Sequence, residues 1–259
     1  MTKPSDQVLS EKKNLAAQLS TGGGLFRIYS PSYSMPQQTA SSFGLQLADG
    51  VDPLQLENYS TFMEKASGVP SNGYSVTLPP FRNGDPSKDN EKSTPSPELL
   101  GLLNVRYILS EYPLDADGLG FISREGSTIV YENEKFRPRA WVEEMSPLHG
   151  TSQKPANVES WGPNRIQISA QGPGLLVLSE NYYPGWQVYV DGKKNTIFPY
   201  AGLLRSVPLS TGQHFIEFVY RPWSVMLGIS LSFLGVSLAI SFELWNRTGK
   251  GSSYASWHN

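Results

Sequence analysis

Residues 165–180 read RIQISAQGPGLLVLSE, and this stretch decides the fold of the second half of the chain. Polar and apolar side chains alternate in RIQISA, the more apolar run LLVLSE follows, and Gly-Pro-Gly lies between them. Alternation with a period of two is typical of a strand with one buried face, whereas Gly and Pro mark turns. The stretch therefore predicts two strands that are separated by a turn.

The same pattern continues as far as residue 220. The runs WQVYV, TIFPY, LLRSVPL and HFIEFVY are separated by short segments with turn residues such as Asp-Gly and Thr-Gly. Short strands at this close spacing indicate a sandwich or a small barrel. We predict an antiparallel β-sandwich over residues 146–222.

The chain before this sandwich carries signals for both strands and helices. LFRIYS (25–30), VRYILS (105–110) and the two halves of residues 118–133 have the composition of strands, the last two around Glu125-Gly126. We therefore expect a mixed α/β region over residues 25–145, and the fold class of the whole chain is α+β. Residues 1–24 contain few apolar side chains and end in Gly-Gly-Gly, so we expect a flexible leader there.

Three helices are predicted within the mixed region. The first begins at Pro36 and ends at Asp49-Gly50, and the last, LLGLLN, is capped by Ser96 and Pro97. The clearest one lies between them, with Asp52 as the N-cap, Pro53 at the first helical position and Gly68 at the end. Its apolar face consists of Leu56, Tyr59, Met63 and Ala66.

Residues 224–242, SVMLGISLSFLGVSLAISF, have the length and composition of a membrane span. They include no charged residue, and about 20 apolar residues are needed to cross a hydrocarbon core of about 30 Å. The ten Val, Ile, Leu and Phe residues favour insertion by about 3 to 6 kcal/mol in total. Trp223 and Trp245 lie at the two ends, where aromatic side chains prefer the headgroup layer. We predict a transmembrane helix over residues 223–245.

The small residues of this segment share one face of the predicted helix. Spans associate by close approach of their backbones over small residues, so this face predicts packing against other transmembrane helices. The alternative is that Ser and Gly are merely tolerated in a single span. The face consists of Gly228, Ser232, Gly235 and Ala239.

Charges on either side of the span predict its orientation. Arg247 and Lys250 follow it and Arg221 precedes it, which favours a short cytoplasmic tail over residues 246–259 and an extracytoplasmic body. Met1 is followed by a polar segment without the apolar core of a signal peptide. We therefore expect either the tail piece of a longer or split multi-pass protein, or a tail-anchored protein with its bulk in the cytosol.

The composition excludes several function classes. The net charge is -2, so no basic field attracts nucleic acid, and the absence of Cys removes thiolate metal sites and thiol nucleophiles. The three His residues have no ligand or triad spacing, and no phosphate-binding glycine motif follows a strand. We predict no metal site and no cofactor within this chain.

One short segment has the residue types of a carbohydrate site. Aromatic faces stack on sugar rings, and carboxylates bond hydroxyl groups, so we predict a possible sugar or headgroup site that includes Tyr182, Tyr183, Trp186 and Asp191. The structural alternative is that Tyr-Pro-Gly and Asp191-Gly192 form turns and that Trp186 fills the core. A glycosidase pair of Glu180 with Asp191 would need a cleft at a set separation.

The arginines of Arg137-Pro138-Arg139 offer a contact for an anionic headgroup, since guanidinium groups match phosphate geometry. The alternative is that Arg139 pairs with Glu143 or Glu144 at the surface.

Several strings together resemble a known family. They include SPSYSMPQQTA (30–40), LLNVRYILS (102–110), YENEKFRPRAWV (131–142), NYYPGWQVYVDG (181–192) and GQHFIEFVYRPW (212–223). This chain resembles the C-terminal region of the YfhO-type bacterial multi-pass membrane proteins, which are similar to glycosyltransferases of the GT-C class.

The resemblance implies an extracytoplasmic domain and last span of a bacterial cell-membrane enzyme that transfers a sugar from a polyprenyl-phosphate donor to a cell-envelope acceptor. It also implies that the catalytic acidic residue lies in upstream spans outside this chain. The expected partners are the lipid bilayer, other spans of the same or a split protein, and a polyprenyl-linked sugar or envelope glycan. The alternative is a single-span, membrane-anchored carbohydrate-binding module.

Overall fold

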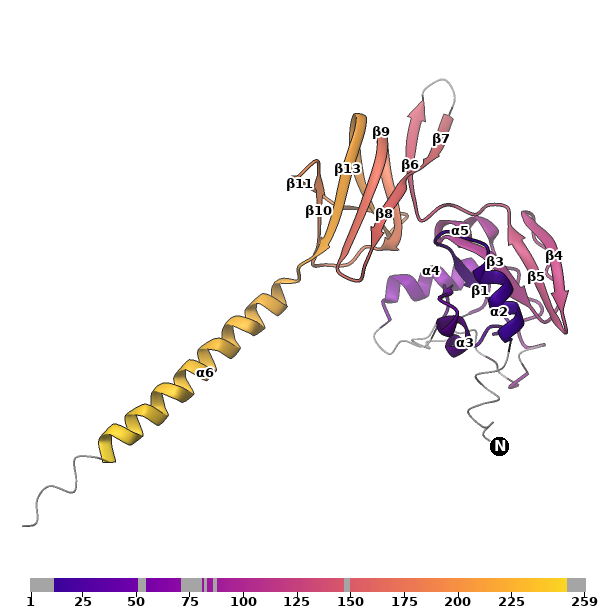
Figure 1. Ribbon diagram of the computed structural model, residues 1–259. Coiled ribbons are helices and arrows are strands. Elements are labelled where there is room, and N and C mark those ends of the chain that lie inside the picture. The colour runs from indigo at the N-terminus through magenta and orange to yellow at the C-terminus, as the bar shows by residue number, and fades with distance from the viewer. Residues whose placement is uncertain are drawn as a thin grey trace, which may run out of the picture.

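The computed structural model describes residues 12–50, 55–70, 81, 83–85, 88–146 and 150–250. Within these residues the chain forms two β-sheets, several helices beside the first sheet, and one long C-terminal helix (Figure 1). This architecture confirms the predicted fold class, a mixed α/β part followed by a β-sandwich and a C-terminal apolar helix.

The first sheet has five strands in the order β2-β1-β3-β5-β4. Strand β1 pairs in parallel with β2 and β3, whereas β5 pairs antiparallel with β3 and β4. The predicted strands within residues 25–30, 105–110 and 118–133 are confirmed. The strands are β1 (Arg27–Tyr29), β2 (Gln46–Leu47), β3 (Val105–Ser110), β4 (Leu119–Glu125) and β5 (Thr128–Asn133).

Two of the predicted helices lie beside this sheet, and each has one of its expected ends. Helix α5 (Pro97–Leu102) is capped by Ser96, whose hydroxyl accepts a hydrogen bond from the backbone N–H of Leu99 at 3.3 Å. Helix α4 (Glu57–Ser67) ends at Gly68, which has a left-handed φ of 69° that favours glycine. Its predicted start is wrong, because Leu56 has an extended backbone and serves as the N-cap. The proposed cap at Asp52 and Pro53 lies outside the described residues.

The helix predicted from Pro36 to Gly50 is too long. Helix α3 (Gln37–Ser42) stops before Gly44, whose φ of 68° is left-handed, and the next residues form β2 at the edge of the sheet. The local pattern therefore contains a helix, a turn and a strand. Pairing of β2 with β1 adds backbone hydrogen bonds that a local sequence window does not report.

The expectation of a flexible leader is wrong for its last part. Helix α2 (Lys13–Ser20) buries Leu15, Ala16 and Leu19 against Phe26 and Ile28. The apolar residues recur at a spacing of three to four, which is a helical stripe although it covers only two turns. Residues 1–11 lie outside the described residues.

The second sheet has eight strands and folds into two layers. One layer contains β8, the first half of β9, the second half of β13, β10 and β11. The other contains β7, β6, the second half of β9, the first half of β13 and β12. The strands are β6 (Ala140–Ser146), β7 (Gly150–Pro155), β8 (Asn157–Trp161), β9 (Arg165–Asn181), β10 (Trp186–Val190), β11 (Lys193–Asn195), β12 (Phe198–Tyr200) and β13 (Leu204–Tyr220).

Strands β9 and β13 pass from one layer to the other. Four strands predicted as separate in this region are therefore two long strands, and the Gly-Pro-Gly at residues 172–174 is a bend within β9. The register of β13 shifts between Leu209 and Gly212, which lie opposite this bend in β9. The layers enclose one core that includes Ile168 and Phe218 from one side and Leu176 and Val207 from the other. The predicted sandwich thus forms by folding a continuous sheet.

The sandwich and the first sheet share a second core. Trp141, Val177 and Leu204 of the sandwich pack in one cluster with residues such as Tyr29 and Ile108 of the first sheet. The second sheet begins at Ala140, six residues before the start expected for the sandwich. The two parts therefore meet along a buried apolar interface.

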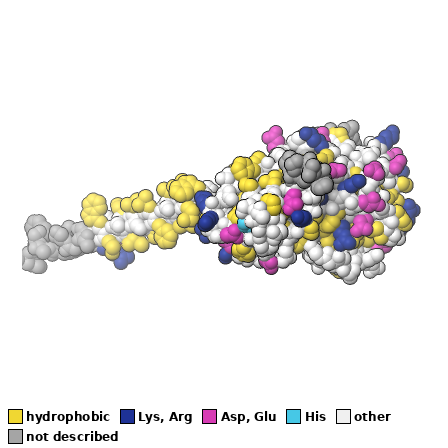
Figure 2. Space-filling view, turned by 90° about the horizontal axis from the view of Figure 1, so that it is seen from above, with side chains coloured by type: hydrophobic (Ala, Val, Ile, Leu, Met, Phe, Trp, Pro, Cys, Tyr) yellow, Lys and Arg dark blue, Asp and Glu magenta, His cyan; other side chains and the backbone are white. Residues whose placement is uncertain are grey.

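Helix α6 (Trp223–Lys250) projects from the sandwich, away from both sheets (Figure 1). Its segment Trp223–Arg247 is long enough to cross a membrane. An 18-residue window within it has a mean hydropathy of 2.1, and none of that window is buried inside the protein. Figure 2 shows hydrophobic side chains along the described part of this exposed helix. The serines Ser230, Ser232, Ser237 and Ser241 donate hydrogen bonds to carbonyls four residues earlier. These hydroxyl groups are thus satisfied within the helix, as a lipid environment requires.

Gly101 provides a test of the packing of α5. A Cβ atom at this position would lie 2.1 Å from the backbone carbonyl oxygen of Lys135. We expect Gly101→Ala to lower the free energy of unfolding by about 2 kcal/mol, because the backbone must move to relieve the clash. Denaturant titration monitored by tryptophan fluorescence measures this change. At Gly120 an added Cβ would lie 3.3 Å from the carboxylate end of the Glu134 side chain and 3.9 Å from the backbone oxygen of Glu132, which is an ordinary contact. Gly120→Ala should therefore have little effect, and an equal loss in both variants would contradict the prediction.

Candidate functional site

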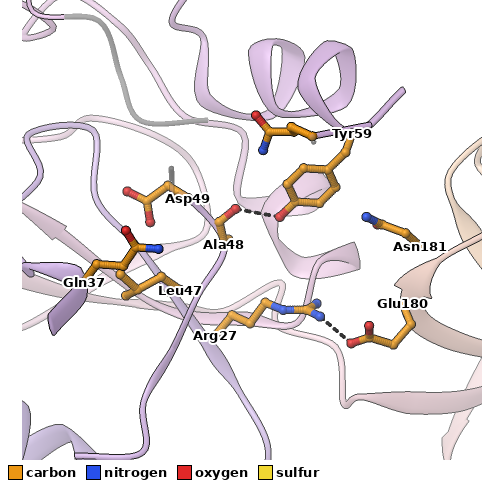
Figure 3. A pocket seen from close by; sticks show the side chains of 10 residues that line it. Arg27, Gln37, Leu47, Ala48, Asp49, Tyr59, Glu180 and Asn181 are labelled. Carbon is orange, nitrogen blue, oxygen red and sulfur yellow. Dashed lines mark hydrogen bonds and ion pairs between the residues drawn. The ribbon is translucent and has the colours of Figure 1, made fainter. Parts of the chain in front are cut away.

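A polar cavity of about 260 Å³ lies between the first sheet and the sandwich (Figure 3). Arg27 begins β1, Asp49 is the second residue after β2, and Tyr59 belongs to α4. Glu180 and Asn181 come from the end of β9. Segments that are more than a hundred residues apart in the sequence therefore build one site.

Glu180 accepts from two arginines at one side of this cavity. The Arg27 guanidinium contacts the Glu180 carboxylate, and Arg139 Nη1 donates to Glu180 Oε1 at 2.9 Å. The remaining Arg27 contacts include the backbone oxygens of Leu103 and Ser179, each at 3.0 Å from Nη1. Arg139 also donates to Gln46 in β2. The cluster thus joins the two sheets by charge-assisted hydrogen bonds.

Burial and the nearby Arg27 lower the pKa of Arg139 to about 9. Its guanidinium is still protonated at neutral pH, so it is a buried cation that depends on Glu180. The proposed surface pairing of Arg139 with Glu143 or Glu144 is wrong, since Arg139 is only 2% exposed and faces Glu180. This burial also argues against a headgroup contact by Arg139. Arg137 instead pairs with Glu98 at 3.2 Å.

Asp49 lies on the opposite side of the cavity and forms no ion pair with the residues that the structure describes. Its side chain is 6% exposed, and Oδ1 has no hydrogen-bond partner in the part of the chain that the structure describes. Removal from water raises the pKa of Asp49 from its usual range to about 7. Near neutral pH this carboxyl group is therefore divided between its neutral and charged forms.

Tyr59 provides a fixed aromatic wall. Its hydroxyl donates to the carbonyl oxygen of Ala48 at 2.6 Å, and burial raises its pKa to about 12. Tyr59 therefore stays neutral and holds its ring in one orientation beside Arg27 and Asn181, as Figure 3 shows.

The two tyrosines predicted to bind sugar lie elsewhere, near the start of α6. Tyr182 and Tyr183 are 40% and 44% exposed, in the turn between β9 and β10. The backbone N–H of Arg221 donates to the carbonyl of Gly185 at 2.7 Å, which holds this turn against the end of β13. Both tyrosines are accessible to a ligand or to a membrane surface, and their role stays a prediction.

Trp186 and Asp191 are engaged in internal contacts. The guanidinium carbon of Arg205 lies 3.7 Å from the centre of a Trp186 ring, and burial lowers the pKa of Arg205 to about 10. Asp191 has a left-handed φ of 52° in the turn before β11 and accepts a hydrogen bond from the backbone N–H of Phe215 at 2.9 Å. Neither Trp186 nor Asp191 lines the cavity beside Asp49. Their predicted role in binding also remains open.

Asp191, His214 and Ser210 form a hydrogen-bonded row that the sequence did not predict. His214 Nδ1 lies 2.7 Å from Asp191 Oδ2, and Nε2 lies 3.2 Å from Ser210 Oγ. Nε2 also lies 3.0 Å from the backbone oxygen of Ser210. Hydrogen bonding to Asp191 raises the pKa of His214 above its ordinary value. Both ring nitrogens thus face acceptors, which favours a positively charged imidazolium over a base that activates serine.

Glu180 and Asp191, considered above as a carboxylate pair, therefore serve different contacts. Glu180 binds two arginines at the cavity, and Asp191 binds His214 at a turn. Among the described residues, no group of three or more His, Cys, Asp or Glu side chains has the spacing to hold a metal ion.

The cavity beside Asp49 was missed by the sequence analysis. Its residues come from β1, β2, α3, α4 and β9, and no local motif connects them. The available signals were charged side chains in otherwise apolar runs, such as Arg27 in LFRIYS and Asp49 in LQLADG. A charged residue in an apolar strand indicates a buried partner, but it does not identify that partner.

These features define the class of protein as a two-sheet body joined to an apolar helix of membrane-spanning length. Residues 144–232 match the family described as bacterial membrane protein YfhO. The matched range runs from the end of β6 into the first half of α6, and it confirms the resemblance to the C-terminal region of YfhO-type proteins. No curated protein and no solved structure matches the chain.

Proposed function

We propose that this chain is the extracytoplasmic C-terminal domain and a membrane span of a YfhO-type glycosyltransferase that uses a polyprenyl-phosphate sugar donor. The observation that carries the proposal is the junction of the sandwich with α6. Strand β13 ends at Tyr220 and α6 begins at Trp223, and the family match includes β13 and the part of α6 as far as residue 232. The domain thus has a recognition or structural role beside a catalytic centre that other spans supply.

The exposed side of α6 supports a place among other spans. An added Cβ at Gly228 or Gly235 would meet no atom within 4 Å, so a second helix has room to approach closely. The hydroxyl of Ser232 donates to the Gly228 carbonyl at 2.9 Å and so needs no further partner. Ala239 continues the same face. The remaining surface of α6 is apolar and suits lipid.

A single-span carbohydrate-binding module is the alternative function. It is favoured by the exposed rings of Tyr182 and Tyr183 and by the polar cavity between the sheets. Such a module would bind envelope glycan without taking part in sugar transfer.

The absence of Cys permits a direct test of the proposed orientation. Lys193→Cys places a thiol on the exposed hairpin of the sandwich, and Ser252→Cys places one after α6. In intact cells we expect a membrane-impermeant maleimide to label Lys193→Cys, and to label Ser252→Cys only after permeabilisation. The unsubstituted protein is the control for background labelling. Labelling of Ser252→Cys alone in intact cells would place the body in the cytosol and contradict the proposal.

The role in sugar transfer is tested by the sugar content of the cell envelope. Deletion of the gene should remove one glycosyl substituent, and the complete gene should restore it. A variant without residues 144–222 should not restore it although the remaining protein reaches the membrane. Unchanged envelope sugar after deletion would favour the binding-module alternative.

A further inference from the structure

The cavity beside Asp49 has a polar wall of mixed charge and a size below that of typical drug-binding pockets, which are about 300 to 1,000 Å³. We propose that it binds a single uncharged sugar residue, with the Asp49 carboxyl group as a central hydrogen-bonding partner and the Tyr59 ring as an apolar wall. The proposal does not depend on the glycosyltransferase role, because a binding module would use the same cavity.

The ion pairs argue against an anionic ligand. Glu180 is neutralised by Arg27 and Arg139, and Arg27 already donates to two backbone oxygens. Both terminal nitrogens of Arg27 are thus engaged by protein oxygens. The charged form of Asp49 would in addition repel an anion. The cationic side chains therefore support the wall of the site and do not select a charged ligand.

The polar groups of the cavity match hydroxyl groups, which both donate and accept hydrogen bonds. Asp49 Oδ1 is buried and has no partner in the described part of the chain, and leaving a buried acceptor unpaired costs about 1–3 kcal/mol. Figure 3 shows Asp49 and Gln37 on one side of the cavity and Asn181 on the other. Side-chain amides supply donors and acceptors together. A ring with several adjacent hydroxyl groups would satisfy these residues at the same time.

The remaining wall is apolar and rigid. Leu47 and Ala48 lie between the polar groups, and Ala48 is 2% exposed. The Tyr59 ring is held by the hydrogen bond from its hydroxyl to Ala48. Sugar rings expose C–H groups on one face, and an aromatic or aliphatic wall is suited to cover them. The volume of about 260 Å³ equals that of about nine water molecules at about 30 Å³ each, which is enough for one ring but not for a chain.

Saturation-transfer NMR on the full chain in lipid nanodiscs tests this proposal. The probes are the methyl glycosides of glucose, galactose, mannose and N-acetylglucosamine, and nanodiscs avoid sugar-based detergents. We expect at least one glycoside to bind. Asp49→Asn should weaken its binding about tenfold, because a buried charge-assisted hydrogen bond is lost. Asp117→Asn makes the same change at an exposed side chain and should leave binding unchanged.

A second variant keeps the test independent of the stability of Asp49 variants. Gln37 is exposed at the rim of the cavity, so Gln37→Trp should fill the opening without disturbing the core, and it should abolish binding. Circular dichroism melting confirms that the variant is folded.

Three results would overturn the proposal. The first is that no glycoside binds. The second is binding that survives Gln37→Trp but is lost in Tyr182→Ala or Tyr183→Ala, which would place the sugar at the turn near α6. The third is competition by inorganic phosphate or ethanolamine at the same site, which would assign it to a charged ligand. None of these results affects the thiol-labelling or envelope-sugar experiments, so this proposal and the proposed function can fail separately.

Discussion

Replacement of Glu180 by alanine is expected to lower the free energy of unfolding by about 3 kcal/mol at neutral pH. The carboxylate accepts from Arg27 and Arg139, and the Arg139 side chain is 1% exposed. Removal of Glu180 leaves two cations near each other at the interface between the sheets. The expected loss lies at the low end for buried pairs because the Glu180 side chain is 20% exposed. Denaturant titration of the full chain measures it.

A surface pair provides the matched control for Glu180→Ala. Glu132 lies 3.4 Å from Arg106 on the first sheet, and its side chain is 46% exposed. Glu132→Ala should therefore change the free energy of unfolding by less than about 1 kcal/mol. Equal effects of the two substitutions would show that the Glu180 cluster is screened by water and does not connect the sheets.

Replacement of Asp49 by asparagine is expected to stabilise the protein at pH 8 and to have little effect at pH 4. Burial raises the pKa of Asp49 from 3.8 to about 7 in the folded state, so the unfolded chain loses the proton first as the pH rises. The penalty for a charged Asp49 is absent below pH 4, grows between pH 4 and pH 7, and is complete above pH 7. Its full size is about 4 kcal/mol, and asparagine avoids it.

The difference in unfolding free energy between Asp49→Asn and the unsubstituted protein, measured from pH 4 to pH 8, tests this expectation. Asp117→Asn removes one carboxylate at an exposed site and corrects for the change in net charge. A difference that stays constant with pH would mean that Asp49 is ionised in the folded protein over the whole range. Addition of a bound glycoside should reduce the difference at pH 8, because ligand hydroxyl groups would stabilise the carboxylate.

The sequence predicted those elements whose signals are local. The span was visible because composition alone distinguishes it, and α5 was visible because Ser96 and Pro97 mark its start. The strands of the sandwich were found from their alternation. Their continuity was not found, because Gly172 and Gly174 are typical of turns and only pairing with β13 keeps β9 extended through them.

The candidate site could not be predicted from local sequence patterns, because distant segments build it. Asp49 is buried by segments distant in the sequence, and its environment exists only after the two sheets pack together. Arg139 was expected at the surface because its neighbours include Glu143 and Glu144, yet its partner Glu180 belongs to another strand. The sequence predicted a sugar site at the aromatic residues of a turn. The observed cavity instead contains one tyrosine among amides and carboxylates.

The short connection at Arg221 and Pro222 has a mechanical consequence. Two residues extend by at most about 7 Å, and Pro fixes one of the backbone angles. The carbonyl of Pro222 accepts from the N–H of Val225 at 3.2 Å, so the bend is anchored to the first turn of α6. Because this connection is so short, the two sheets have little rotational freedom relative to α6. A change in the tilt of α6 therefore rotates the two sheets with the helix.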